Sequence, residues 1–288
     1  MVSQLQDDAL RAYIEDFIRG FLAQQENNNL GPDSSEPAWD RFVIAFSRAD
    51  DPLYHFLKEH IGEEHWTPAE AFALGLPDDE TPPRPEELTV VSWALAQTEK
   101  TKAANRQQTR YPAEAWARAR SYGQRCQRRL QRALVEALAS AGCQAVAPSL
   151  LKEHRETESP SVGRASNWSE RHVAYISGLG TFGLCGGLIT ELGQAVRLGS
   201  LVIRAHVTPT PRPPGGPFAY CLFYRDSSCS ACADRCPAGS VSPAGRDKEA
   251  CARQVQVEAV EFIRREYNLD SSGCGLCQTA VPCESCIP

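Results

Sequence analysis

Nine of the twelve cysteines in the chain lie between residues 221 and 288, and most are separated by short gaps. They follow the pattern Cys221-x7-Cys229-x2-Cys232-x3-Cys236-Pro, then Cys251, then Cys274-x2-Cys277-x5-Cys283-x2-Cys286. A gap of two residues lets neighbouring thiolates bind adjacent irons of one cubane cluster. This block therefore predicts a metal-binding module whose chemistry is electron transfer.

Residues 229–237 match the end of the bacterial ferredoxin pattern C-x2-C-x2-C-x3-C-P, in which the cysteine before proline binds the other cluster of a pair. The first cysteine of that pattern would fall at Asp226, and we expect Cys221 to replace it through a longer loop. The crossover predicts two [4Fe–4S] clusters. The predicted ligands are Cys221, Cys229, Cys232 and Cys283 for one cluster, and Cys236, Cys251, Cys274 and Cys277 for the other. Cys286 is left over as the alternative to Cys221.

Two other uses of the cysteines stay open. One is a single cubane cluster beside zinc or structural thiols, since two C-x2-C pairs can form a zinc ribbon, and the other is disulfides. The Cys-Pro step, the three-residue gap and the supply of eight ligands favour clusters over zinc. The first residues, MVSQLQDDAL, lack a signal-peptide pattern, and no apolar run approaches the roughly 18 residues of a membrane span. We therefore expect a soluble protein of the reducing cytoplasm, with no membrane partner.

The rest of the chain must position this module. Periodic apolar residues predict helices over 7–24 and 112–141, further helical signals cover 40–75, and short β-rich runs predict strands over 88–96 and 143–148. The segment 208–217, TPTPRPPGGP, is a linker by composition. We expect an α+β chain with three parts: a helical N-terminal region over 1–84, an α/β domain over 85–208, and the two-cluster domain over 218–288.

A glycine-rich stretch after residue 169 carries further candidates. Backbone without a Cβ allows close approach to a flat cofactor, so Arg171, Gly178, Gly180, Gly183 and Gly186 are candidate cofactor-binding residues. Glu170 and His172 are candidate catalytic residues: His172 could donate a proton or bind the metal of a cofactor, and Glu170 could form a cofactor clamp with Arg171. The alternatives are tight packing of the glycines, an ion pair between Glu170 and Arg171, and a structural hydrogen bond for His172. Cys185 fits a small buried packing residue better than a cofactor contact.

The predicted helix over 112–141 has a strongly basic face. It carries Arg118, Arg120, Arg125, Arg128, Arg129 and Arg132. This face would suit RNA or phosphate, or it would simply be solvated. The net charge of −6 does not suggest an electrostatic nucleic-acid binder, although a local basic patch would allow one, and we favour the solvated face.

The block CSACADRCPAGSVS…CGLCQTAVPCESCIP, together with SERHVAYISGLGTFGLCGGLIT, resembles the double-cluster iron–sulfur proteins related to epoxyqueuosine reductase, which are similar to reductive dehalogenases. The resemblance covers roughly residues 85–288. It implies a nitroreductase-like α/β domain holding cobalamin, followed by a ferredoxin-like domain. The clusters would take electrons from reduced ferredoxin or flavodoxin and pass them singly to the corrinoid.

This chain departs from that pattern. In the family, a D-x-x-P-x-x-E-R stretch supplies the proposed proton donor, an aspartate. Glu170 and Arg171 match its last two residues, but Arg164 and Asn167 stand at the aspartate and proline positions, and Leu184 replaces the lysine of GLGWxGK. We therefore expect a reductive enzyme with a different substrate. The alternative is an electron-transfer protein without a corrinoid that relays electrons to a partner enzyme, and a redox or iron sensor is a third, weaker hypothesis.

Overall fold

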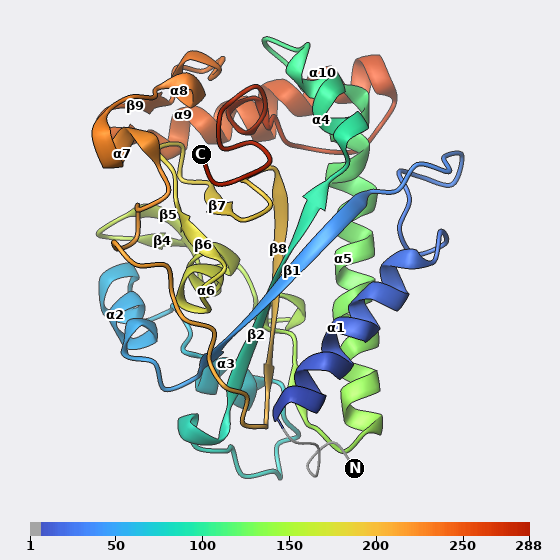
Figure 1. Ribbon diagram of the computed structural model, residues 1–288, viewed down its shortest axis with the longest axis vertical. Helices are drawn as coiled ribbons and strands as arrows, with labels where there is room; N and C mark the ends of the chain where they lie inside the picture. The colour runs from blue at the N-terminus through green and yellow to red at the C-terminus, as the bar shows by residue number, and fades with distance from the viewer. Residues whose placement is uncertain (1–6) are drawn as a thin grey trace.

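A four-stranded antiparallel sheet runs through the centre of the computed structural model, which describes residues 7–288 (Figure 1). Its strand order is β1 (Trp39–Arg48), β2 (Thr89–Gln97), β8 (Val196–Ile203) and β3 (Ala145–Val146). Every residue of β2 is buried, as expected for a central strand rich in β-branched and aromatic residues. The strands predicted over 88–96 and 143–148 are confirmed.

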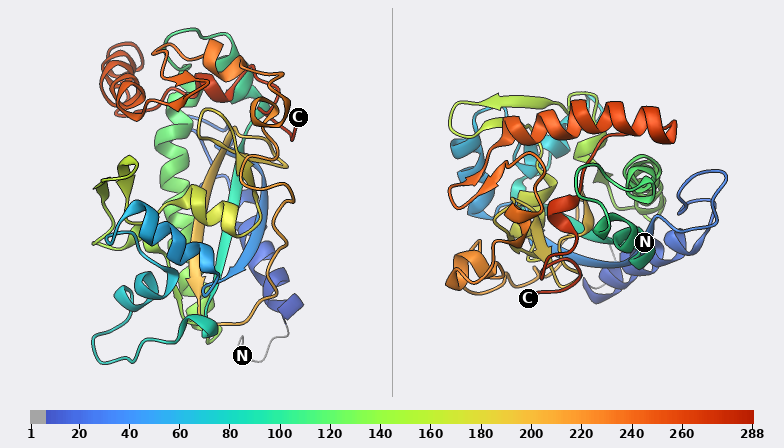
Figure 2. Two further views of the ribbon diagram at one scale, coloured as in Figure 1. Left: turned by 90° about the vertical axis from the view of Figure 1, so that its left-hand side faces the viewer. Right: turned by 90° about the horizontal axis from the view of Figure 1, so that it is seen from above.

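Two long helices cover one face of this sheet. They are α1 (Asp7–Ala23) and α5 (Glu114–Ser140), and both confirm the predicted helices. Apolar residues at helical spacing, among them Ile14 and Ile18 of α1 and Leu130 and Leu134 of α5, pack against Trp93 of β2 in one core. The views in Figures 1 and 2 show α1 and α5 side by side along the strands.

Three shorter helices cover the opposite face. These are α2 (Pro52–Ile61), α3 (Pro68–Leu74) and α6 (Glu170–Ile176). Thr67 and Glu70 form a reciprocal capping box that fixes the start of α3. Tyr54, Phe72 and Val173 from the three helices pack in a second core with Val90 of β2. The chain is therefore a mixed helix-and-sheet structure in three layers.

The N-terminal region is not only helical. Residues 39–48 lie where the sequence indicated helix, but they form the edge strand β1 and pair with β2. The run FVIAF offers side chains that suit a half-buried pleated surface, and pairing with β2 outweighs helix propensity. The linker lies along β1, because Thr210 N donates to the Phe46 carbonyl oxygen over 2.9 Å.

Smaller elements connect these layers. They are α4 (Glu99–Arg106), the hairpin β4 (Glu156–Ser159) with β5 (Gly163–Ser166), the hairpin β6 (Gly180–Phe182) with β7 (Leu188–Thr190), and the 3-10 turns Pro85–Glu87 and Pro148–Leu150. The β6–β7 hairpin contains the glycine-rich stretch. It projects Cys185 and its neighbours toward the cysteine-rich segment.

The cysteine-rich segment lies across the end of the sheet where β2 finishes and β8 begins (Figure 2). Its elements are α7 (Leu222–Asp226), α8 (Ala231–Asp234), β9 (Val241–Ser242), β10 (Gly245–Arg246), α9 (Lys248–Arg253), a π-helical turn Gln254–Glu258, α10 (Ala259–Tyr267) and the 3-10 turn Leu276–Gln278. Within residues 7–288, no helix combines the length and the apolar character needed to cross a membrane.

Candidate iron–sulfur and cofactor site

The structure divides eight of the C-terminal cysteines into two groups of four. Cys236, Cys251, Cys274 and Cys277 all line a cavity of about 950 Å³, hereafter the large cavity. Cys221, Cys229, Cys232 and Cys283 all line a small, mostly apolar cavity beside it. This is the division that the ferredoxin crossover predicts. We call the group at the small cavity the first cysteine set and the group at the large cavity the second cysteine set.

The ninth C-terminal cysteine stands apart from both sets. Cys286 is exposed and lines neither cavity, whereas Cys221 is buried among the first set. Within residues 7–288, no group of three or more His, Cys, Asp or Glu side chains is arranged to hold a single metal ion. Eight thiols in two groups of four fit the donor requirement of two [4Fe–4S] clusters.

Cys185 lies between the two sets and lines both cavities. It is buried, and its thiol is close enough to Cys232 and Cys277 to share hydrogen bonds with both, which lowers the pKa of Cys185 and raises the pKa values of its partners. Sequence spacing offered no signal for this position, because Cys185 is far along the chain from either set. Only the β6–β7 hairpin brings it there.

Several polar groups point at the cysteine sulfurs. Gln194 Nε2 lies 3.1 Å from Cys283 Sγ, the backbone nitrogen of Ser240 lies 3.3 Å from Cys236 Sγ, and Arg246 Nη2 lies 2.8 Å from Cys251 Sγ. Burial acts to raise the pKa of Cys236, but the hydrogen bonds from Ser240 and nearby backbone outweigh it and lower that pKa. Such donors stabilise negative charge on sulfur, as a cluster-bound thiolate requires.

Burial is the main influence on two further thiols in these sets. Burial raises the pKa of Cys274 to about 11 and the pKa of Cys283 to about 12. A thiol in that state becomes a good ligand only when a metal displaces its proton. Loading of the two sets is therefore expected to release protons.

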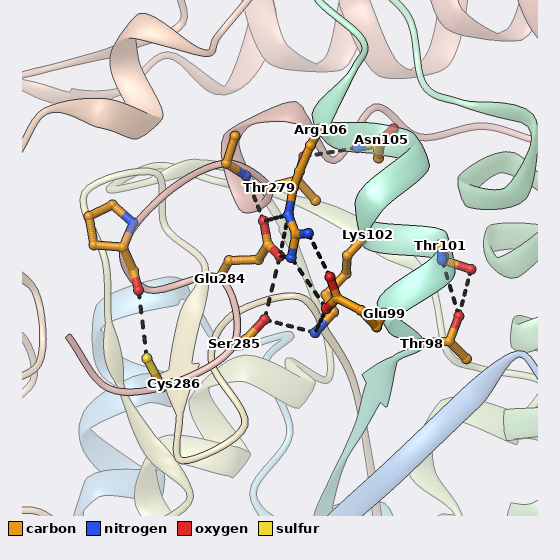
Figure 3. A network of polar contacts seen from close by, with 12 residues as sticks. Thr98, Glu99, Thr101, Lys102, Asn105, Arg106, Thr279, Glu284, Ser285 and Cys286 are labelled. Carbon is orange, nitrogen blue, oxygen red and sulfur yellow. Dashed lines mark hydrogen bonds and ion pairs between the residues drawn. The ribbon is translucent and has the colours of Figure 1, made fainter.

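The segment that carries the last cysteines is anchored to α4 by a polar network (Figure 3). Glu284 is only 5% exposed and forms an ion pair with Arg106, which also binds Glu99. Lys102 Nζ lies 2.7 Å from the hydroxyl of Ser285, and Asn105 Nδ2 lies 3.2 Å from Thr279 Oγ1. These bonds fix the loop between Cys277 and Cys283 against the sheet domain.

Glu170 faces the large cavity from the start of α6. It accepts a hydrogen bond of 2.6 Å from Ser200 Oγ, which in turn accepts one of 3.1 Å from Trp168 Nε1. Burial raises the pKa of Glu170, although these hydrogen bonds oppose the shift. A carboxyl group with a raised pKa in a cavity is well suited to donate a proton.

His172 is oriented into a different cavity. This third cavity, of about 870 Å³, is lined by aromatic and aliphatic residues including Phe56, Tyr175, Phe182 and Phe218, and we call it the apolar cavity. His172 Nδ1 lies 2.8 Å from Ser169 Oγ, as a structural hydrogen bond requires. Burial and the neighbouring Arg171 lower the pKa of His172 to about 3, so its ring is neutral at physiological pH.

The candidate cofactor residues separate into two groups. Arg171 lines both the large and the apolar cavity and donates to the Gly186 carbonyl oxygen over 2.7 Å, and Gly183 and Gly186 line the apolar cavity. Gly178 and Gly180 line neither of these cavities. A Cβ on Gly178 would meet the linker carbonyl of Pro211 at 2.8 Å, and one on Gly180 would meet the Ile189 carbonyl at 2.0 Å. Both of these glycines permit tight backbone packing.

No protein-family model and no curated protein sequence matches the chain. Among solved structures, a catabolic reductive dehalogenase matches with a TM-score of 0.51 and 12% identity over 95% of this chain and 37% of its own length. A reductive dehalogenase structure described as suggesting a mechanism for B12-dependent dehalogenation matches with a TM-score of 0.50 and 12% identity over 94% of this chain and 36% of its own.

A selenomethionine-labelled epoxyqueuosine reductase matches with a TM-score of 0.49 and 19% identity over 95% of this chain and 66% of its own length. The chain thus spans somewhat less than two thirds of that reductase and little more than a third of the dehalogenases. At these identities the likeness concerns the fold alone. Nearly the whole chain therefore shares its fold with reductive dehalogenases.

Proposed function

We propose that the chain is an iron–sulfur oxidoreductase that passes single electrons through two [4Fe–4S] clusters to a cobalamin for reductive chemistry. The observation that carries this proposal is the large cavity, which the second cysteine set and the carboxyl group of Glu170 line together. Electrons delivered at these cysteines and protons delivered by Glu170 would meet in one space. A relay protein would need no such cavity, so we favour the enzyme.

The two cysteine sets give the electron path a direction. The first set would receive electrons from reduced ferredoxin or flavodoxin, and the second set would pass them into the large cavity. Cys185 contacts Cys232 of the first set and Cys277 of the second, so it would lie between the two clusters. In this proposal, residues 218–288 form the ferredoxin-like part and the central sheet belongs to a nitroreductase-like part.

The large cavity has room for a cofactor, because its volume of about 950 Å³ lies at the upper end of typical ligand pockets. A dehalogenase of the same fold is described in terms of B12-dependent chemistry. Bound cobalamin would supply a cobalt centre that accepts single electrons and reduces the substrate. Arg171 and Trp168 line the cavity and would hold the cofactor.

Glu170 is our candidate for the proton donor. Its side chain is fixed by Ser200 and Trp168, and burial favours its protonated form. This assignment takes account of the missing family aspartate, whose place Arg164 occupies while paired with Glu156 at 2.8 Å. His172 is neutral and faces the apolar cavity, so we propose that it orients Ser169 and leave proton donation to Glu170.

The test is anaerobic purification and cluster reconstitution, followed by visible spectra with and without cobalamin or flavin. We expect about eight irons and eight sulfides per chain and a bound corrinoid whose spectrum changes when the clusters are reduced. Clusters that cycle with neither cofactor bound would support the electron relay instead. Fewer than about five irons per chain, or stoichiometric zinc, would contradict the two-cluster proposal.

A further inference from the structure

One wall of the large cavity carries several arginines. Arg120, Arg125 and Arg128 come from α5, and Arg197 comes from β8. The basic face predicted for the helix over 112–141 is therefore not uniformly solvated. Arg118 forms an ion pair with Asp33 and Arg129 donates to the Glu26 carbonyl oxygen, whereas these three arginines face the cavity.

The carboxylates of the cavity do not neutralise this wall. Three carboxylates line it, and none forms an ion pair with these arginines. Glu156 pairs with Arg164 at 2.8 Å and Asp270 pairs with Arg264 at 3.5 Å. Glu170 accepts from Ser200, and it lies near Arg197 with burial favouring its neutral form. Three of these arginines form no ion pair and no side-chain hydrogen bond with any described residue: Arg120, Arg128 and Arg197. The Nη1 atom of Arg120 is buried without a partner.

Arg128 is exposed, whereas Arg120 and Arg197 are partly buried, and the unpaired guanidinium groups of these two need a counter-ion. Burial and mutual repulsion with Arg120 lower the pKa of Arg197, and burial lowers the pKa of Arg120. Arginine nevertheless keeps its proton in proteins, so these side chains stay positively charged. Burial of an unpaired positive charge lowers the stability of the folded protein. An anion bound here would compensate the positive charge and accept hydrogen bonds from the guanidinium N–H groups.

The number of cations indicates which anion fits. Three unpaired guanidinium groups exceed the single charge of a carboxylate, whereas a phosphate ester carries about −1.5 to −2 at neutral pH. Arg246 does not add to this wall, because it donates to Cys251 and so serves the second cysteine set. The unpaired arginines line the cavity, so we expect the anion to be part of a small molecule that enters it.

We propose that Arg120, Arg128 and Arg197 form a phosphate-binding subsite of the large cavity, so that the molecule held there carries a phosphate group. This deepens the proposed function by giving the ligand class of the same site. Glu170 lies close to Arg197, and its protonated form would donate to a bound phosphate. The phosphate belongs either to a substrate or to the nucleotide tail of the corrinoid.

The test uses the cluster-loaded protein and inorganic phosphate as the probe, with binding followed by calorimetry and by thermal unfolding. We expect saturable binding that raises the unfolding midpoint. Arg197→Gln and Arg120→Gln should each weaken binding about tenfold or more, because each removes a charge-assisted contact. Arg132→Gln is the matched control, since Arg132 is exposed on the same helix outside the cavity lining.

A second readout separates binding from folding damage. Without phosphate, Arg197→Gln should be at least as stable as the wild type, because it removes an unpaired cation, and its iron content should be unchanged. Equal phosphate binding by the wild type and Arg197→Gln would overturn the proposal, as would the absence of saturable binding to the wild type. If the protein binds phosphate but holds fewer than eight irons, the proposed function is wrong and the phosphate subsite stands.

Two corrinoids assign the phosphate to its source. Cobalamin carries a nucleotide phosphate and cobinamide lacks it. If phosphate competes with cobalamin but not with cobinamide, the subsite serves the cofactor. If the cobalamin-loaded protein still binds phosphate, and loses that binding in Arg197→Gln, the subsite serves a phosphorylated substrate.

Discussion

The amide nitrogen of Gln194 lies 3.1 Å from the sulfur of Cys283, and the same nitrogen donates to the Cys277 carbonyl oxygen over 3.1 Å. One buried amide therefore contacts a member of each cysteine set. Its oxygen accepts from the thiol of Cys185, 3.2 Å away. Gln194 lies two residues before the start of β8, so the end of the central sheet positions the amide between the two sets.

We expect Gln194→Leu to make the reduction potential of the first cluster more negative. An N–H donor to a ligand sulfur stabilises the extra negative charge of the reduced cluster, and its loss costs about 1 kcal/mol, or about 40 mV for one electron. The measurement is a redox titration followed by electron paramagnetic resonance. The second cluster should shift less, because Gln194 touches only a backbone oxygen of Cys277. Equal shifts of both clusters would argue against this contact.

Replacement of Cys286 should leave the iron content unchanged. Cys286 is exposed and lines neither cavity, whereas Cys221 is buried among the first set. Cys286→Ser should therefore keep about eight irons per chain, and Cys221→Ser should fall toward about four as one four-iron cluster is lost. The measurement is iron and sulfide analysis after identical reconstitution. Loss of iron in Cys286→Ser alone would make Cys286 the eighth ligand.

Cys236→Ser should damage the cluster held by Cys274 and Cys277. Cys236 is four residues from Cys232 in sequence, yet the two line different cavities. We expect the spectroscopic signal of the second cluster to weaken while that of the first remains, and Cys232→Ser should give the opposite result. If both variants weakened the same signal, the crossed ligand assignment would be wrong.

Much of the fold follows from local patterns. Two helices, α1 and α5, have regularly spaced apolar residues, and β2 has a run of strand-forming residues. These local signals agree with the packing in the fold, so the sequence predicts these elements correctly. The strand β1 was wrongly assigned to a helical region. Its identity depends on pairing with β2, which lies more than 40 residues away along the chain, and no local pattern reports that contact.

The site shows the same limit. The division of the cysteines could be predicted because ferredoxin spacing encodes a crossover within one segment. The positions of Cys185 and Arg197 at the cavity could not be predicted, because a hairpin and a strand of the sheet bring them there. Cys185 was interpreted as a small buried packing residue in preference to a cofactor contact, and it is indeed buried, in a core cluster with Cys221. Its place between the sets depends on topology, which short-range spacing does not contain.

Loss of Arg106 should destabilise the loop that carries Cys277 and Cys283. Arg106→Ala leaves Glu284 buried without its ion-pair partner, a change that costs about 3 kcal/mol, at the low end for buried pairs because Arg106 is partly exposed. The thermal unfolding midpoint should fall by about 6 °C or more. Arg84→Ala, which removes an exposed pair with Glu87, is the control and should change the midpoint little.

Glu170 should impose a pH dependence on both activity and stability. Because burial raises its pKa in the folded state, the protein binds this proton more tightly folded than unfolded. The stability that the proton contributes is complete below the ordinary pKa of a glutamate and is lost as the pH rises through the raised folded pKa. A reaction that needs Glu170 as proton donor should slow over the same rise in pH.

Glu170→Gln tests both effects together. The stability difference between wild type and Glu170→Gln should move in favour of the variant as the pH increases, because the glutamine cannot ionise in the cavity. Electron transfer from the clusters to bound cobalamin should persist in the variant. Substrate reduction should lose most of its rate, and the remaining rate should no longer fall as the pH rises. Glu191→Gln, at an exposed position before β8, is the matched control and should track the wild type. A variant that keeps the wild-type pH profile for substrate reduction would remove Glu170 from the proton path and leave the electron path untouched.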